Sequence, residues 1–305
     1  MNVSTKLSFA ALKYTGNNPL VLNVEISKDC NLNCKYCGRV KEDKGLLDFN
    51  KIIKAIDEVN TPIVYFTGGE PFLFFDELKQ AVGYALAKNK IVFIVTNGTL
   101  VKNKLRELDV NKENLILMFS VDGLKEKNDS IRGEGSFEKM MEGLIKAKEK
   151  GFNVWLNFKI YKENMDELEK VVNFFKNKVD KIHLNLFYDF ERKNKKSNLD
   201  NFSEKALKLK KETKNILNLK TYFKFWQGKD LDCTPWRIVT IDVEGWRSPC
   251  YFKCNGHAKS YKELMKDTDW KLQSKCRECK GYCEFEPTVY KNKGLLVKEL
   301  MMRLW

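Results

Sequence analysis

Short apolar runs alternate with amphipathic segments over the first 190 residues of the chain. The runs are rich in β-branched and aromatic residues, which is typical of buried strands, and the segments between them repeat apolar residues at helical spacing. The expected strands span 21–26, 63–66, 91–95, 115–119, 154–160 and 182–187. The expected helices in this part span 48–59, 76–88, 101–108, 136–150 and 165–175.

Strands that alternate with helices in this way pair in parallel through right-handed crossovers. The chain has six such strands, fewer than the eight of a closed TIM barrel. We therefore expect an α/β fold with an incomplete (β/α)6 TIM-type barrel over residues 19–190, preceded by a short leader over residues 1–18. Its functional loops should lie at the carboxyl ends of the strands, as they do in complete barrels.

Composition adds three constraints. The 305 residues are 43% hydrophobic and 31% charged, which fits one large domain or one with an appendage. The formal charge of +14 raises the odds of an anionic partner, although a solvated lysine-rich surface is the simpler interpretation. Nine cysteines without a signal peptide favour metal binding in a reducing cytoplasm over a disulfide framework, and no apolar run approaches the length of about 18 residues that a membrane span needs.

Three of these cysteines follow the first expected strand directly. Cys30, Cys34 and Cys37 stand at Cys-x3-Cys-x2-Cys spacing in a polar loop. Such a loop can hold three corners of a 4Fe-4S cluster and leave one iron open to the amino and carboxylate groups of S-adenosylmethionine. Zinc on three thiolates and water is the alternative.

Polar or glycine-rich turns follow the next three strands. Gly68-Gly69-Glu70-Pro71 follows the second, Asn97 the third, and Ser120-Val121-Asp122-Gly123 comes at the end of the fourth. The two glycines would let the backbone approach a ligand, and Glu70 could accept a hydrogen bond from an ammonium group. Singly, each segment is compatible with an ordinary turn. Their succession at strand ends, beside the cysteine loop, indicates one site.

Together these motifs, with Tyr36 before the third cysteine, resemble the radical SAM enzymes over residues 19–190. The resemblance implies reductive cleavage of S-adenosylmethionine to methionine and a 5′-deoxyadenosyl radical, fed by an electron donor such as ferredoxin or flavodoxin. It also implies that the Gly-Gly-Glu segment holds the methionine amino group, that Ser120 or Asp122 lies near the ribose or carboxylate, and that Arg132 pairs with the carboxylate. The residues expected to bind this cofactor are Tyr36, Gly68, Gly69, Glu70, Pro71, Asn97, Ser120, Asp122 and Arg132.

The remainder of the chain divides into an extension over residues 191–287 and a tail over residues 288–305. The basic run 191–196 is expected to be a solvated linker, and 206–219 an amphipathic helix that covers the open side of the barrel. Four of five cysteines are expected to hold a second iron-sulfur cluster, with zinc as the alternative, and Cys254 fits this pattern least well. The five are Cys233, Cys250, Cys276, Cys279 and Cys283. The spacing around Gly245 is similar to the hairpin that opens such auxiliary-cluster extensions.

A closer resemblance comes from the extension, where Thr234-Pro235-Trp236, 245–251 and 283–287 look like the hopanoid-biosynthesis radical SAM proteins of the adenosyl-hopene transferase type. It implies that the adenosyl radical adds to the alkene of a lipid-like acceptor. One position departs from that pattern. Val95 stands where that group carries a cysteine proposed to quench the adduct radical, and valine has no labile hydrogen to donate. The acceptor and the last step can therefore differ.

Several alternatives stay open. The tail is expected to form an amphipathic helix that packs on the barrel or lies on a membrane surface. A different radical SAM reaction would abstract hydrogen from a small molecule or a peptide. A non-enzymatic iron-sulfur or zinc protein that binds RNA is the interpretation from another class, and nucleic acid is disfavoured because no RNA-binding signature is visible. The only two histidines, His183 and His257, are expected to be structural.

Overall fold

The computed structural model describes residues 6–7, 13, 18–37, 45–186, 199–226, 234–248 and 256–274. Several expectations lie outside these residues: most of the leader, the basic run 191–196, the tail 288–305, and all six cysteines of the extension. Those cysteines are Cys233, Cys250, Cys254, Cys276, Cys279 and Cys283.

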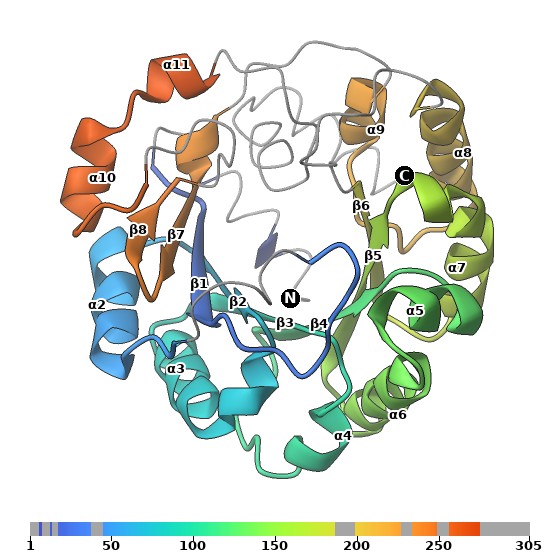
Figure 1. Ribbon diagram of the computed structural model, residues 1–305, viewed down its shortest axis with the longest axis horizontal. Helices are drawn as coiled ribbons and strands as arrows, with labels where there is room; N and C mark the ends of the chain where they lie inside the picture. Colours follow the sequence, from blue (N-terminus) through green and yellow to red (C-terminus); the bar gives the residue numbers. More distant parts are fainter. Residues whose placement is uncertain are drawn as a thin grey trace.

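Six parallel strands form the main sheet, each paired with the next along the chain. They curve into an open ring with the helices outside (Figure 1). These strands are β1 (Val21–Ser27), β2 (Ile63–Gly68), β3 (Ile91–Thr96), β4 (Leu115–Val121), β5 (Asn153–Ile160) and β6 (Lys181–Leu186). All six expected strands and the incomplete barrel are confirmed.

The helices that follow these strands bury their apolar faces against the outer side of the sheet. Asp48 caps the first of them, because its Oδ1 accepts a hydrogen bond from the Lys51 backbone at 3.1 Å. None of the described helices combines the length and the apolar character that a membrane crossing requires. The helical elements of the barrel are α2 (Phe49–Val59), η2 (Pro71–Phe74), α3 (Phe75–Ala87), α4 (Val101–Lys104), α5 (Lys125–Arg132), α6 (Ser136–Glu149), η3 (Lys162–Glu167) and α7 (Leu168–Phe175).

The two faces of the sheet differ in character because side chains alternate along each strand. Leu22, Val24 and Ile26 point outward into the core beneath the helices. The inner face is apolar near the amino ends of the strands, where Phe93 and Trp155 pack together in a second cluster. Nearer the carboxyl ends it is polar, with hydrogen bonds of 2.8 Å between Asn23 and Thr67 and 2.9 Å between Asn157 and His183. The barrel interior therefore has an apolar floor and a polar wall.

The extension adds to the sheet instead of forming a separate layer. After the turn η4 (Pro235–Arg237), strand β7 (Ile238–Asp242) pairs in parallel with β1, and β8 (Gly245–Arg247) returns antiparallel to β7. The expected hairpin around Gly245 is present. Helix α10 (Tyr261–Asp267) packs against α2 and β8, and α11 (Trp270–Ser274) follows it (Figure 1).

The helix expected over 206–219 is wrong in its bounds. The structure has α8 (Leu199–Glu212) and α9 (Lys220–Trp226), and the segment between them follows the edge of β6. The Leu217 backbone donates to Ile182 at 2.7 Å, and the Asn218 side chain bonds the N–H and the C=O of Leu184 at 2.7 and 3.0 Å. An edge strand exposes unpaired backbone groups, so pairing there outweighs the helical pattern of the segment.

We expect replacement of Asn218 by alanine to lower the free energy of unfolding by about 1–3 kcal/mol, because two buried backbone groups of Leu184 lose their partners. Chemical denaturation monitored by circular dichroism measures this loss. Asn173→Ala is the control, since the exposed Asn173 accepts only from Lys176 in the described contacts, and its effect should stay within about 0.5 kcal/mol. Equal losses in the two variants would contradict the role of Asn218.

Candidate active site

The cysteine loop is bound to the end of β2 by a direct contact between backbones. The Gly69 N–H donates to the Ser27 carbonyl at 2.7 Å, and the Glu70 N–H donates to the Asp29 carbonyl at 2.8 Å. A Cβ on Gly69 would lie 1.9 Å from the Asp29 oxygen, and one on Gly68 would lie 2.2 Å from the Ser27 oxygen. The glycine pair was predicted to admit a ligand, and in the structure it admits the backbone that leads to Cys30.

The Glu70 carboxylate ties the ends of β2 and β3 together. It is 1% exposed and accepts hydrogen bonds from the Phe72 N–H at 3.1 Å, the Thr96 hydroxyl at 2.7 Å and the Asn97 N–H at 2.7 Å. Burial raises the pKa of Glu70 to about 7, against the opposing effect of these donors. With three protein donors on this carboxylate, Glu70 acts in the described structure as a positioning residue for the two strand ends.

Asn97 carries that arrangement on to the first cysteine. Its amide donates to the Asn31 side chain at 2.8 Å and lies 3.8 Å from the Cys30 sulfur. Asn31 in turn donates to the Thr99 hydroxyl at 2.8 Å. The end of β3 therefore fixes the first half of the cysteine loop.

Two contacts from other elements fix the second half of the loop. The Lys35 N–H donates to the Ile131 carbonyl, in the last turn of α5, at 3.0 Å. The Tyr36 ring stacks on the Tyr161 ring with 4.5 Å between centroids. The sequence analysis singled out Tyr36 and missed Tyr161, although Tyr161 directly follows β5 and the strand-end rule used for β2 to β4 would have found it.

Asp122 and Arg132 form a buried ion pair beside the loop. The Arg132 Nε lies 2.6 Å from the Asp122 Oδ2, and the two side chains are 7% and 1% exposed. The Asn164 amide donates to the Asp122 carbonyl at 2.7 Å and so fixes the backbone there. The second oxygen of Asp122, Oδ1, is buried without a hydrogen-bond partner among the described residues. Arg132 was predicted to pair with a cofactor carboxylate, and here it neutralises Asp122.

The donor set fits an iron-sulfur cluster. Cys30, Cys34 and Cys37 are free thiols of intermediate exposure, and the Leu32 N–H points at the Cys30 sulfur at 3.5 Å. Burial raises the pKa of Cys30 to about 11 and also raises that of Cys34, so both thiols are protonated at neutral pH until a metal displaces the protons. Among the described residues, no three histidine, cysteine or acidic side chains converge closely enough to hold a single metal ion.

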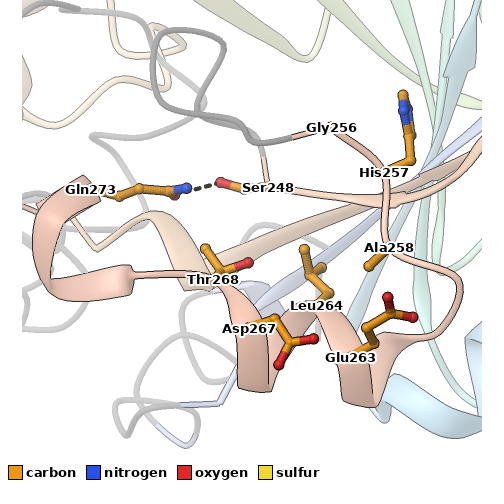
Figure 2. Close-up of a pocket in the computed structure, with 9 residues that line it drawn as sticks. All are labelled: Ser248, Gly256, His257, Ala258, Glu263, Leu264, Asp267, Thr268 and Gln273. Carbon is orange, nitrogen blue, oxygen red and sulfur yellow. Dashed lines mark hydrogen bonds between the residues drawn. The ribbon is translucent and has the colours of Figure 1, made fainter.

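The structure thus gathers most of the predicted residues at the carboxyl ends of the strands. Pro71 begins the turn η2 directly after Glu70, and Ser120 lies on the inner face of β4 beside Asn157 of β5. A separate small cavity of about 140 Å³ lies in the extension, between the end of β8, α10 and α11, and contains no predicted site residue (Figure 2). At its edge the Ser248 hydroxyl donates to the Gln273 carbonyl oxygen at 2.7 Å.

Comparison with known proteins gives two family matches. A model described as the radical SAM superfamily matches residues 24–175, and one described as a domain of unknown function, DUF3463, matches residues 185–302. The chain is 29% identical over 182 residues to the Fe-coproporphyrin III synthase of Methanosarcina barkeri, covering 55% of this chain and 44% of that protein. It is 31% identical over 173 residues to a probable GTP 3′,8-cyclase of Sulfurisphaera tokodaii, covering 53% and 54%. The chain therefore spans about half the length of these relatives.

Among solved structures, native anSMEcpe with bound AdoMet and the Cp18Cys peptide is similar in fold. The TM-score is 0.62 at 21% sequence identity, and the match covers 94% of this chain and 98% of that one. At this level of identity the comparison supports the fold alone, an α/β partial barrel.

We expect Gly69→Ala to displace the cysteine loop, because the new methyl group would overlap the Asp29 carbonyl. The variant should retain less than half of the iron that the wild type binds after anaerobic reconstitution. Gly83→Ala is the control: nothing lies within 4 Å of its Cβ position, and alanine in α3 should stabilise the helix by up to about 1 kcal/mol. Full iron binding by Gly69→Ala would show that the loop tolerates separation from β2.

Proposed function

The chain is a member of the radical SAM enzyme superfamily, and from this premise we propose that it cleaves S-adenosylmethionine reductively. Cys30, Cys34 and Cys37 would hold a 4Fe-4S cluster. When bound, that cluster supplies one electron to the sulfonium, which gives methionine and a 5′-deoxyadenosyl radical. The observation that carries the proposal is the convergence of the cysteine loop with the ends of β2, β3 and β4.

The residues around the loop have distinct roles in this proposal. Asp122 Oδ1, a buried acceptor without a partner among the described residues, suits an ammonium or hydroxyl group of the cofactor. Arg132 pairs with Asp122 and adds positive charge near Cys34. Glu70 and Tyr161 act through other groups, since Glu70 holds Asn97 and Tyr161 holds Tyr36.

For the acceptor we propose an unsaturated, lipid-like molecule that gains the adenosyl group. The support is the resemblance of the extension to the hopanoid-biosynthesis proteins. Val95 lies on the inner face and packs against the apolar floor. A valine side chain has no labile hydrogen, so it cannot supply the hydrogen that completes the product. One electron from a ferredoxin or flavodoxin and one proton would then reduce the adduct radical. A cytoplasmic enzyme, in contact with a membrane surface when it meets a lipid, fits this proposal.

Hydrogen abstraction from a polar small molecule or a peptide is the second candidate. The polar wall of the barrel favours it, because Asn23, Thr67, Asn157 and His183 offer hydrogen-bonding groups that a hydrocarbon cannot use. The solved anSMEcpe structure holds a peptide together with AdoMet, which makes a peptide a reasonable test substrate.

In the extension we propose a second iron-sulfur cluster on four of the five cysteines Cys233, Cys250, Cys276, Cys279 and Cys283. Thiolates from two well-separated groups of cysteines can complete such a cluster with no open iron. Zinc remains the competing ion for this donor set.

Mass spectrometry on the reconstituted enzyme with reductant and S-adenosylmethionine tests the reaction. Adenosyl addition predicts a product heavier by the adenosyl group, and hydrogen abstraction predicts stoichiometric free 5′-deoxyadenosine. Cys34→Ala should abolish both outcomes. Asn33→Ala, an exposed change in the same loop, should leave them intact. Cleavage that survives in Cys34→Ala would refute the cluster assignment.

Metal analysis tests the extension separately. The wild type should bind about eight irons per chain, and both Cys34→Ala and Cys279→Ala should lose about four of them. If zinc occupies the extension, Cys279→Ala would lose zinc and keep its iron, and the wild type would bind only about four irons. Plasma emission spectroscopy with a sulfide assay distinguishes the two results.

A further inference from the structure

A second group of charged side chains lies on the other side of β1, on the hairpin of the extension. The Arg247 guanidinium bridges two acidic residues, with Nη2 2.6 Å from Glu25 Oε1 and Nε 2.9 Å from Asp242 Oδ2. The side chains of Glu25 and Asp242 are each 3% exposed and that of Arg247 is 11% exposed. All three stand on the inner face, because their neighbours Val24, Ile241 and Trp246 point into the outer core.

The group extends across the hairpin turn to Lys28, at the start of the cysteine loop. Asp242 Oδ1 accepts from the Glu244 and Gly245 backbones at 2.9 and 3.2 Å, which fixes the turn. His257 lies 3.0 Å from Asp242 through Nε2 and 3.0 Å from Glu244 through Nδ1. Glu244 also pairs with Lys28, whose side chain is buried. Both histidine nitrogens are thus engaged by the hairpin, in line with the expected structural role of His257.

Arg247 offsets the electrostatic repulsion between Glu25 and Asp242. Glu25 and Asp242 are two buried carboxylates at adjacent strand positions, and without a cation between them their mutual repulsion in a low-dielectric site would be large. Burial alone would raise the pKa of Asp242, but hydrogen bonds from Arg247 and His257 bring it below its ordinary value. Removal of Arg247 would take away the cation that lies between these two buried carboxylates, one on β1 and one on β7.

The position of this group on β1 links it to the cysteine loop. Glu25 and Lys28 lie five and two residues before Cys30. Between them, Ser27 accepts the Gly69 N–H from the opposite side, and Asp29 then accepts the Glu70 N–H. The segment that carries the first cysteine is therefore held by β2 on one side and by the β7–β8 hairpin on the other.

We infer that Arg247 is a positioning residue for the cysteine loop, which it fixes through Glu25 and the Asp242–Glu244 turn of the extension. The extension thereby takes part in setting where Cys30 stands relative to Cys34 and Cys37. This inference rests on the proposed function insofar as these thiols hold the cluster.

The test compares Arg247→Gln with Arg237→Gln. Arg237 belongs to the same extension and is fully buried, but its Nη1 donates to the Asn18 carbonyl at 2.9 Å near the opposite end of β7. Loss of a group that hydrogen-bonds a metal ligand typically costs about 10- to 100-fold in metal affinity. Arg247 acts one step further from the ligands, so Arg247→Gln should weaken iron binding at the first site by up to about tenfold. Its reduced cluster should also show an altered electron paramagnetic resonance spectrum and a shifted potential. Arg237→Gln should unfold at lower temperature and keep the wild-type spectrum.

Glu244→Gln keeps the inference testable if Arg247→Gln does not fold. Glu244 is nearly half exposed, and the change weakens its ion pairs with Lys28 and His257, the two that it forms among the described residues. It should change the spectrum in the same direction by a smaller amount. Wild-type spectra and potential in folded Arg247→Gln, or in Glu244→Gln, would overturn the inference. A wild-type protein that binds no cluster would instead overturn the proposed function.

Discussion

The contact between Gly69 and the Asp29 carbonyl is the constraint on which the rest of the site depends. Two backbones approach so closely there that no side chain fits between them. Because β2 ends in this contact, the cysteine loop leaves β1 already attached to its neighbour, and Glu70 follows with its carboxylate bonded to Thr96 and Asn97. Asn97 then reaches back to Cys30. These contacts link the ends of β1, β2 and β3 to the first cysteine of the loop.

The strands and most of their helices were predictable because hydrophobic periodicity reports burial directly. The helix α5 was missed since its only buried apolar residue is Ile131, so its pattern carries no periodic signal. The end of α8 was misplaced for the opposite reason: residues after Glu212 keep a helical pattern, but the unpaired edge of β6 takes them as partners. The local hydrophobic pattern cannot show which strand will form the edge of the sheet, because that depends on how many strands the sheet contains.

The candidate site shows a similar division. The residue types at the strand ends were enough to locate it, because parallel strands bring their carboxyl ends to one edge. The partners of those residues were not predictable. Glu70 accepts hydrogen bonds from three protein donors and Arg132 pairs with Asp122, so two side chains expected to bind a cofactor also have protein partners around the site. A sequence identifies a charged residue without showing whether a protein group or a ligand neutralises it.

The parallel pairing of β7 with β1 has a consequence for how the protein is made. Val21 pairs with Ile238, so the strand that precedes the first cysteine gains its second neighbour only when nearly four-fifths of the chain has left the ribosome. Amino-terminal segments begin to fold during synthesis, whereas contacts of such long sequence separation must wait for loop closure. A nascent chain therefore offers its thiols from a loop supported on one side until β7 and β8 have been synthesised and have paired with β1.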